Sequence, residues 1–204
     1  MFILLVQLAE LLICSVAYSW SRNGRKLLTA STDNTVALWE LLTGECEHRY
    51  RFPSPILRAE FHKRNDNVFL VCPLKHAAIL VRANGQHFPI PTDDELGQDL
   101  NITATFDRRG THIYTGNGKG KISIFDSNNL SLVASYRQQS NHAVKDIVFA
   151  RKGRYFLTNS ADRIIRVYDS ERAVACGLKG DCEPVQKLQD LVNKCVVTYP
   201  LMLD

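Results

Sequence analysis

The chain has 204 residues, of which 45% are hydrophobic and 23% charged, and its formal net charge is +4. This balance is typical of a globular protein with a sizeable core, and it excludes wholesale disorder. The small positive charge permits an acidic partner but does not require one.

The chain opens on an apolar stretch, MFILLVQLAELLICSVAYSW. No Lys or Arg precedes Arg22, so the basic region of a signal peptide is absent, and Glu10 makes a membrane span costly. We expect a short helix or strand that packs on the neighbouring element. Secretion or membrane anchoring remains an alternative, because Asn101 and Asn129 begin glycosylation patterns.

Four segments of about 43 residues then repeat one pattern. Each begins with an alternating apolar strand that ends in an aromatic residue, followed by a basic turn, a second strand, a small polar turn and a third strand. A weaker fourth strand completes the copy. The first strands end at Trp20, Phe61, Phe106 and Phe149. Alternation with a period of two excludes helical repeats of similar length.

Three of the third strands end in an aromatic followed by an acid, at Trp39, Phe125 and Tyr168. Four short strands per repeat are typical of a propeller blade, and the pattern resembles the WD-repeat family, although none of these copies reads Trp-Asp. The fold class expected is all-β: a partial WD-repeat β-propeller of about four four-stranded blades in an open arc. The resemblance implies that Asp33 and Asp162, in the turns between second and third strands, are structural hydrogen-bonding residues of the blade.

Catalytic motifs are absent from the sequence, so we expect no enzyme, no catalytic residues, no cofactor and no metal site. The glycine-rich segment 116–121 leads into a strand, whereas a phosphate loop leads into a helix, so it is interpreted as a hairpin turn. The cysteines are scattered without a C-x-x-C pair, and we expect reduced thiols.

Basic residues recur in the turns between first and second strands, which blade topology sends to one rim. The rim is a solvated surface or the footprint of an acidic partner. The residues concerned are Arg22, Arg25, Lys26, Lys63, Arg64, Arg108, Arg109, Arg151, Lys152 and Arg154.

Longer strings are more specific: RFPSPI at 51–56, ADRIIRVYD at 161–169 and QKLQDLVN at 186–193. They resemble the propeller subunits of complexes that methylate lysine 4 of a histone. The resemblance implies a nuclear, non-catalytic scaffold and chromatin regulator, whose partners are methyltransferase complex subunits and the nucleosome, with no small-molecule substrate and no membrane. It also implies that Arg163 and Lys194 contact nucleosomal DNA.

The resemblance covers most of the chain but not its ends. We expect a divergent N-terminal segment at 1–15, a partial propeller at 16–194 and a divergent tail at 195–204. Two other functions remain open: a generic WD-repeat interaction module unrelated to chromatin, and the secreted or membrane-anchored β-protein already mentioned.

Overall fold

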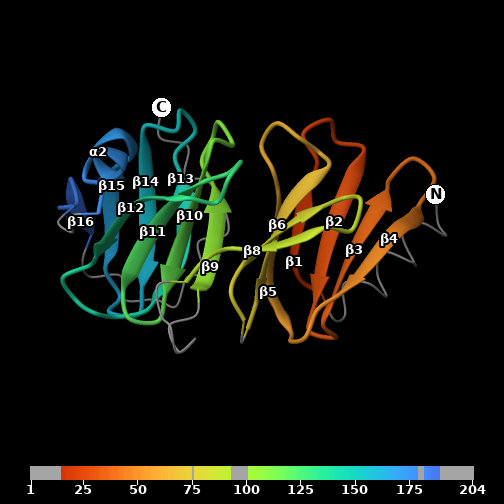
Figure 1. The fold of residues 1–204 in the computed structure, drawn as a ribbon, viewed down its shortest axis with the longest axis horizontal. Helices are drawn as coiled ribbons and strands as arrows, with labels where there is room; N and C mark the ends of the chain where they lie inside the picture. The colour runs from red at the N-terminus through yellow and green to blue at the C-terminus, as the bar shows by residue number, and fades with distance from the viewer. Residues whose placement is uncertain (1–14, 75, 93–100, 179–181, 189–204) are drawn as a thin grey trace. The chain divides into compact units, whose positions relative to one another are not determined.

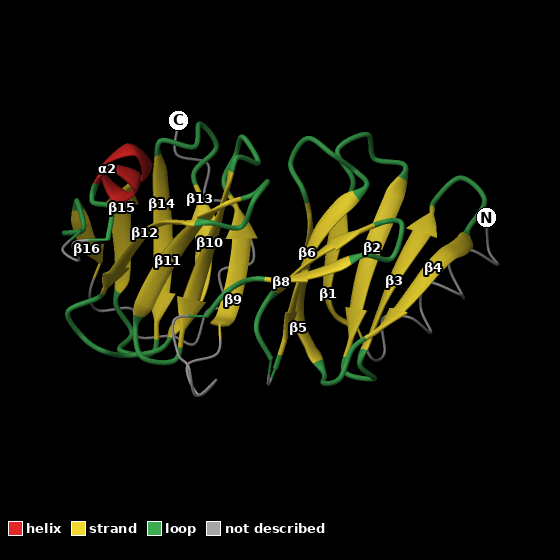
Figure 2. Cartoon of the chain, in the orientation of Figure 1, coloured by secondary structure: helices red, strands yellow, loops and turns green. Residues whose placement is uncertain are grey.

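The protein is described here from a computed structural model, which describes residues 15–74, 76–92, 101–178 and 182–188. The described residues form antiparallel β-sheet with one short helix (Figures 1 and 2). The chain divides after Pro91 into two compact units, and each unit contains two four-stranded sheets.

The first unit contains the first and second blades. In each blade the strands lie in the order of the chain, joined by hairpins. The first blade consists of β1 (Ser15–Trp20), β2 (Lys26–Ser31), β3 (Thr35–Glu40) and β4 (Glu45–Arg51). The second consists of β5 (Ile56–Phe61), β6 (Val68–Pro73), β7 (Ile79–Arg82) and β8 (His87–Pro89).

The second unit contains the third and fourth blades, with the same strand order. The third blade consists of β9 (Asn101–Phe106), β10 (His112–Asn117), β11 (Lys121–Asp126) and β12 (Leu132–Arg137). The fourth consists of β13 (Val144–Phe149), β14 (Tyr155–Ser160), β15 (Ile165–Asp169) and β16 (Gln186–Leu188). The predicted four blades of four strands are confirmed.

The repeat register is also confirmed. Trp20, Phe61, Phe106 and Phe149 each end the first strand of a blade. The third-strand aromatics occupy one equivalent register position. Trp39 pairs with Leu27, Phe125 with Ile113 and Tyr168 with Phe156, always the second residue of the second strand. The glycines of the first-to-second-strand turns have the positive φ that such turns need: Gly24, Gly110 and Gly153.

The core of each unit lies between its two blades. In the first unit, Leu28 and Leu38 of the first blade belong to one buried cluster with Phe61 and Phe69 of the second. In the second unit, Tyr114 and Ile124 of the third blade pack with Phe149, Phe156 and Tyr168 of the fourth. Alternation in each strand places one apolar set on this shared face, and its burial drives the association of the blades.

A short helix, α2 (Ser170–Ala175), interrupts the fourth blade between its third and fourth strands. The repeat pattern did not predict it. Asp169 caps its first turn by accepting hydrogen bonds from the amides of Glu171 and Arg172 (3.0 and 3.2 Å). At the other end, the Gly177 carbonyl accepts from the amide of Ser135 in β12 (3.0 Å), so the helix joins the third blade to the fourth.

Further observations concern composition and motifs. Segment 116–121 forms the β10–β11 hairpin, as predicted. The cysteines of the described ranges, Cys46, Cys72, Cys176 and Cys182, are free thiols. Across these same ranges, the structure contains no helix that could span a membrane and no acidic, histidine or cysteine cluster that could hold a metal. Of the apolar opening stretch, residues 15–20 form β1, and the rest lies outside the described residues.

Candidate partner-binding site

The turn between β14 and β15 places an arginine in left-handed backbone. Arg163 has a φ of 66°, and the equivalent residues of the first and third blades, Asn34 and Gly120, have φ values of 70° and 79°. Glycine and asparagine adopt this conformation readily, whereas another side chain costs about 1 kcal/mol or more. The turn geometry is therefore shared, and Arg163 is the residue type least suited to it.

Asp162 closes this turn and also holds a buried arginine. Its Oδ1 accepts a hydrogen bond from the amide of Ile164 (3.1 Å). Both carboxylate oxygens accept from Arg166: Nη1 lies 3.2 Å from Oδ1 and Nη2 lies 2.5 Å from Oδ2. The side chains are almost fully buried, with 9% of Asp162 and 4% of Arg166 exposed. This is a bidentate ion pair, the strongest form of carboxylate recognition by arginine.

The carboxyl pKa values follow these contacts. Burial acts to raise the pKa of Asp162, but hydrogen bonds and the charge of Arg166 outweigh it and lower the pKa to about 2. The pKa of Asp33, in the equivalent turn of the first blade, is also lowered, chiefly by the hydrogen bond from the Thr35 hydroxyl (2.6 Å). Both aspartates accept hydrogen bonds within their own turns, and their structural role in the blade stays a prediction.

The ion pair leaves Arg163 available. Both Asp162 oxygens are occupied by Arg166, so the neighbouring carboxylate does not neutralise Arg163. Arg163 is exposed, and its side chain makes no hydrogen bond or ion pair with the described part of the chain. An exposed, unpaired guanidinium on a fixed turn is suited to contact an anionic partner.

A linker, residues 138–143, joins this turn to the corresponding turn of the third blade. The amide of Gln138 donates to the carbonyl of Gly120 (2.9 Å), and the amide of Ala161 donates to the carbonyl of Ala143 (2.9 Å). The β10–β11 and β14–β15 turns therefore lie at the same end of the second unit, which we call the turn end.

Cations gather at the turn end. Lys121 and Arg137 stand directly opposite across neighbouring strands, and Lys187 stands opposite Arg166, whose own charge is paired with Asp162. Like charges in this position are destabilising. Burial, and then the charge of Arg137, lowers the pKa of Lys121. Lys119 in the adjacent turn adds another positive charge, so the region around Arg163 attracts anions.

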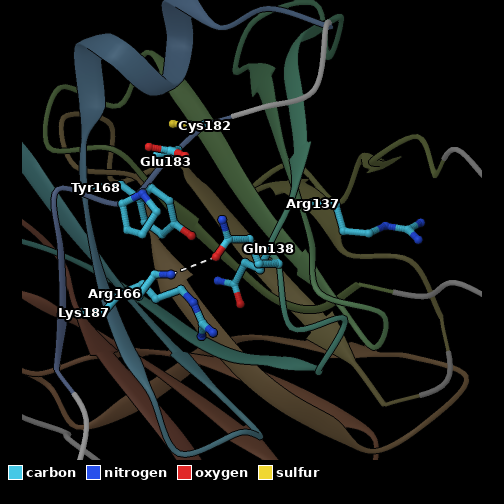
Figure 3. A pocket seen from close by; sticks show the side chains of 9 residues that line it. Arg137, Gln138, Arg166, Tyr168, Cys182, Glu183 and Lys187 are labelled. Carbon is cyan, nitrogen blue, oxygen red and sulfur yellow. Dashed lines mark hydrogen bonds between the residues drawn. The ribbon is translucent and has the colours of Figure 1, made fainter.

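A pocket of about 230 Å³ lies beside the turn, between the third and fourth blades (Figure 3). Arg166, Lys187, Gln138 and Tyr168 face one another there, while the Arg137 side chain points away. Gln138 is buried, and its side-chain amide donates to the Thr158 hydroxyl (2.8 Å) and accepts from the Ser160 hydroxyl (2.6 Å). These hydrogen bonds hold one wall of the pocket against β14, the strand that leads into the turn.

The basic turns predicted to form a rim lie at the opposite end of the blades, where several of them are neutralised. Lys26 pairs with Glu47 (2.7 Å), Lys63 pairs with Glu60, and Arg154 approaches Asp169 (3.7 Å). Within the second unit, the Arg108 guanidinium donates to the carbonyl of Arg151 (3.2 Å), so these two turns do lie side by side. Because paired cations attract an anionic partner less than unpaired ones do, the turn end is the better candidate for a partner-binding site.

Sequence patterns singled out two residues of this turn. Arg163 and Asp162 lie where the repeat alignment placed them, while Lys194 lies outside the described residues. Arg166 and Gln138 were missed. The signal for Arg166 was available: a cation at an inward position of β15, four residues after an aspartate in a tight turn, predicts an ion pair across that turn.

Comparison with known proteins agrees with this architecture. The sequence model of the WD domain, G-beta repeat, matches residues 9–40 and 130–169. The β-propeller domain of Cps50 (Swd1) from Myceliophteria thermophila superposes with a TM-score of 0.78 at 26% sequence identity, covering 88% of this chain and 60% of that one.

Two curated relatives are informative. Over 186 residues the chain is 56% identical to the retinoblastoma-binding protein 5 homolog of Drosophila melanogaster, covering 89% of this chain and 37% of the relative. Over 188 residues it is 26% identical to the Set1 complex component swd1 of Schizosaccharomyces pombe, covering 86% of this chain and 46% of the relative. The chain therefore spans less than half the length of each of these proteins.

Proposed function

We propose that the chain is a WD-repeat protein and a non-catalytic scaffold subunit of a nuclear histone lysine-4 methyltransferase complex. In this role it binds other subunits of the complex and contacts the nucleosome. The observation that carries the proposal is the 56% identity to the Drosophila melanogaster retinoblastoma-binding protein 5 homolog, which extends over nearly the whole chain. The similarity to a Set1 complex component supports the same assignment.

For the nucleosome contact, we propose that Arg163 binds a DNA phosphate together with Lys194. Arg163 supports this role because it is exposed, unpaired and fixed by a turn whose neighbouring acid is already occupied. The surrounding cations, Lys119, Lys121 and Lys187, favour a polyanion at this end. A contact of this kind positions the protein on DNA without reading its sequence.

Complex membership is tested by affinity purification of the tagged 204-residue chain from nuclear extract. We expect methyltransferase subunits to copurify with it. Recovery of other proteins but of no methyltransferase subunit would instead support a generic WD-repeat interaction module. Glycosylated chain in the secretory pathway would exclude the nuclear assignment.

The DNA contact is tested by replacing Arg163 and Lys194 together with glutamate. Binding to nucleosomes should weaken by about 1–3 kcal/mol, equally for different DNA sequences, because phosphate contacts are blind to base identity. The dependence of log affinity on log salt should also fall by about one unit for each phosphate that the variant no longer binds.

The matched control is the double replacement Arg108→Glu and Arg109→Glu, which makes the same charge change at the opposite end of the blades. It should weaken binding much less. Equal losses of affinity from both double variants would mean unspecific basic attraction, and an unchanged affinity of the Arg163/Lys194 variant would remove the DNA contact from the proposal.

A further inference from the structure

Ion pairing of the basic turns differs between the two units. In the first unit, acids stand beside these turns, and Lys26 pairs with Glu47 while Lys63 pairs with Glu60. In the second unit, the β9–β10 and β13–β14 turns carry exposed cations whose side chains form no ion pair with the described part of the chain. These cations are Arg108, Arg109, Arg151 and Lys152. We call the two turns, residues 107–111 and 150–154, the second-unit rim.

The two turns of the second-unit rim are held against each other. The Nε of Arg108 donates a hydrogen bond to the carbonyl of Arg151 (3.2 Å). Gly153 makes room for this contact, since a Cβ at that position would lie only 3.0 Å from the Cβ of Arg108. The backbone thus fixes the Arg108 guanidinium through its Nε and leaves both Nη groups available. A cation that is already held in place loses less conformational entropy when it binds a partner.

The acids of this region are engaged elsewhere. Asp107 accepts hydrogen bonds from the amide and the hydroxyl of Thr111 (2.8 and 2.7 Å) and lies 3.4 Å from Nδ1 of His112. Asp169 caps helix α2, and its Oδ2 lies 3.7 Å from Nε of Arg154. Neither aspartate forms an ion pair with the four cations of the second-unit rim, which therefore keep their charge exposed.

The first unit shows which group occupies the equivalent position. Arg22 and Arg108 are each the second residue after the aromatic that ends the first strand. The amide of Arg22 donates a hydrogen bond to Oδ1 of Asp66 in the β5–β6 turn (2.9 Å), so a carboxylate joins the two turns of the first unit. The β13–β14 turn contains no acid, and the amide of Arg108 has no hydrogen-bond partner within the described ranges. The second unit therefore lacks the carboxylate that the first unit supplies from its own chain.

We propose that the second-unit rim binds an acidic segment of a partner protein, with one carboxylate in the position that Asp66 occupies in the first unit. That carboxylate accepts from the amide of Arg108, and the flanking acids of the segment pair with the guanidinium and ammonium groups around it. Such charge-assisted hydrogen bonds are the strong ones. The occupant in the first unit is a carboxylate on a peptide turn, which favours an acidic peptide over a nucleic acid. This inference does not depend on the proposed function.

The experiment is fluorescence anisotropy of the purified 204-residue chain with a short fluorescein-labelled peptide of alternating Glu and Gly. It is run at low ionic strength, where exposed charges are least screened. The chain should bind this peptide and should not bind the analogue in which Gln replaces every Glu. The double replacement Arg108→Gln and Lys152→Gln should weaken binding of the Glu peptide at least about tenfold, because it removes two charge-assisted contacts.

The matched control is the double replacement Arg22→Gln and Arg64→Gln, which removes the same charge from the equivalent turn positions of the first unit. Asp66 already occupies the carboxylate position there, so this variant should bind the Glu peptide like wild type. All four replaced side chains are exposed, and circular dichroism establishes that both double variants are folded.

A labelled single-stranded oligonucleotide with the same charge as the Glu peptide distinguishes the two kinds of polyanion. The Arg108/Lys152 variant should lose less affinity for the oligonucleotide than for the peptide, and an equal loss would overturn the assignment to an acidic peptide. Failure of wild type to bind the Glu peptide at about 100 µM, or equal losses of peptide affinity in both double variants, would also overturn the proposal.

Discussion

Replacing Asp162 with alanine is expected to destabilise the second unit, because it leaves the Arg166 guanidinium buried without its partner. The lowering of the carboxyl pKa from 3.8 to about 2 corresponds to about 2 kcal/mol of stabilisation by the ionised form. Loss of one member of a buried ion pair typically costs about 3–5 kcal/mol. We therefore expect the free energy of unfolding to fall by about 2–4 kcal/mol.

Asp33→Ala is the matched control, since Asp33 holds the equivalent turn of the first blade through Thr35 without a buried cation. Its loss should cost about 1 kcal/mol, the value of ordinary hydrogen bonds. Both variants are measured by urea unfolding with circular dichroism, and hydrogen exchange of the β14 and β15 amides gives the local effect. Both tryptophans, Trp20 and Trp39, lie in the first unit, so their fluorescence reports on that unit.

A double variant separates a broken ion pair from a damaged turn. Asp162→Ala combined with Arg166→Met removes both charges, and it should recover part of the stability that Asp162→Ala alone removes. Equal destabilisation by Asp33→Ala and Asp162→Ala, or no recovery in the double variant, would refute the argument that the buried arginine is what makes Asp162 important.

Three other predictions concern the second unit. Because the folded-state pKa of Asp162 is depressed, its stabilisation should be complete above about pH 4 and disappear as the pH falls towards 2; urea unfolding of wild type and Asp162→Asn across this range measures the difference. Arg163→Asn should raise the free energy of unfolding by about 0.5 kcal/mol by relieving left-handed strain, while nucleosome binding in a gel-shift assay weakens. Gly116→Ala should cost about 1–3 kcal/mol in thermal unfolding, because its Cβ would lie 2.7 Å from the Val144 side chain, whereas Gly118→Ala meets only an ordinary contact at 3.7 Å.

The strand pattern of this protein was predictable because it is local. Alternation alone places Trp20, Phe61, Phe106 and Phe149 at strand ends, and the structure confirms each of them. Turn geometry was equally accessible, since the glycines and the aspartates recur at fixed offsets. A repeat of known period supplies both kinds of information without any knowledge of tertiary contacts.

The remaining features of the fold and the site depend on tertiary contacts, which the local strand pattern does not contain. Trp20 and Phe149 have the same sequence context and strand position, yet Trp20 is mostly exposed and Phe149 is buried, because Phe149 packs on a neighbouring blade of its own unit. The partnership of Asp162 with Arg166 likewise depends on the inward direction of one side chain of β15. Helix α2 was missed because it replaces part of a repeat, and a search for periodicity has no means of finding an insertion of this kind.

The shared left-handed position of the second-to-third-strand turns has a consequence for how such repeats diversify. Asn34, Gly120 and Arg163 share the same left-handed backbone conformation. Each of these three blades therefore has one turn position where the side chain can be exchanged while the hairpin keeps its shape. A duplicated blade could thus acquire a binding residue by one substitution, with the scaffold unchanged. For protein engineering, a recognition residue could be moved from this turn position in one blade to the equivalent position in another. It would then have the same orientation relative to its own sheet.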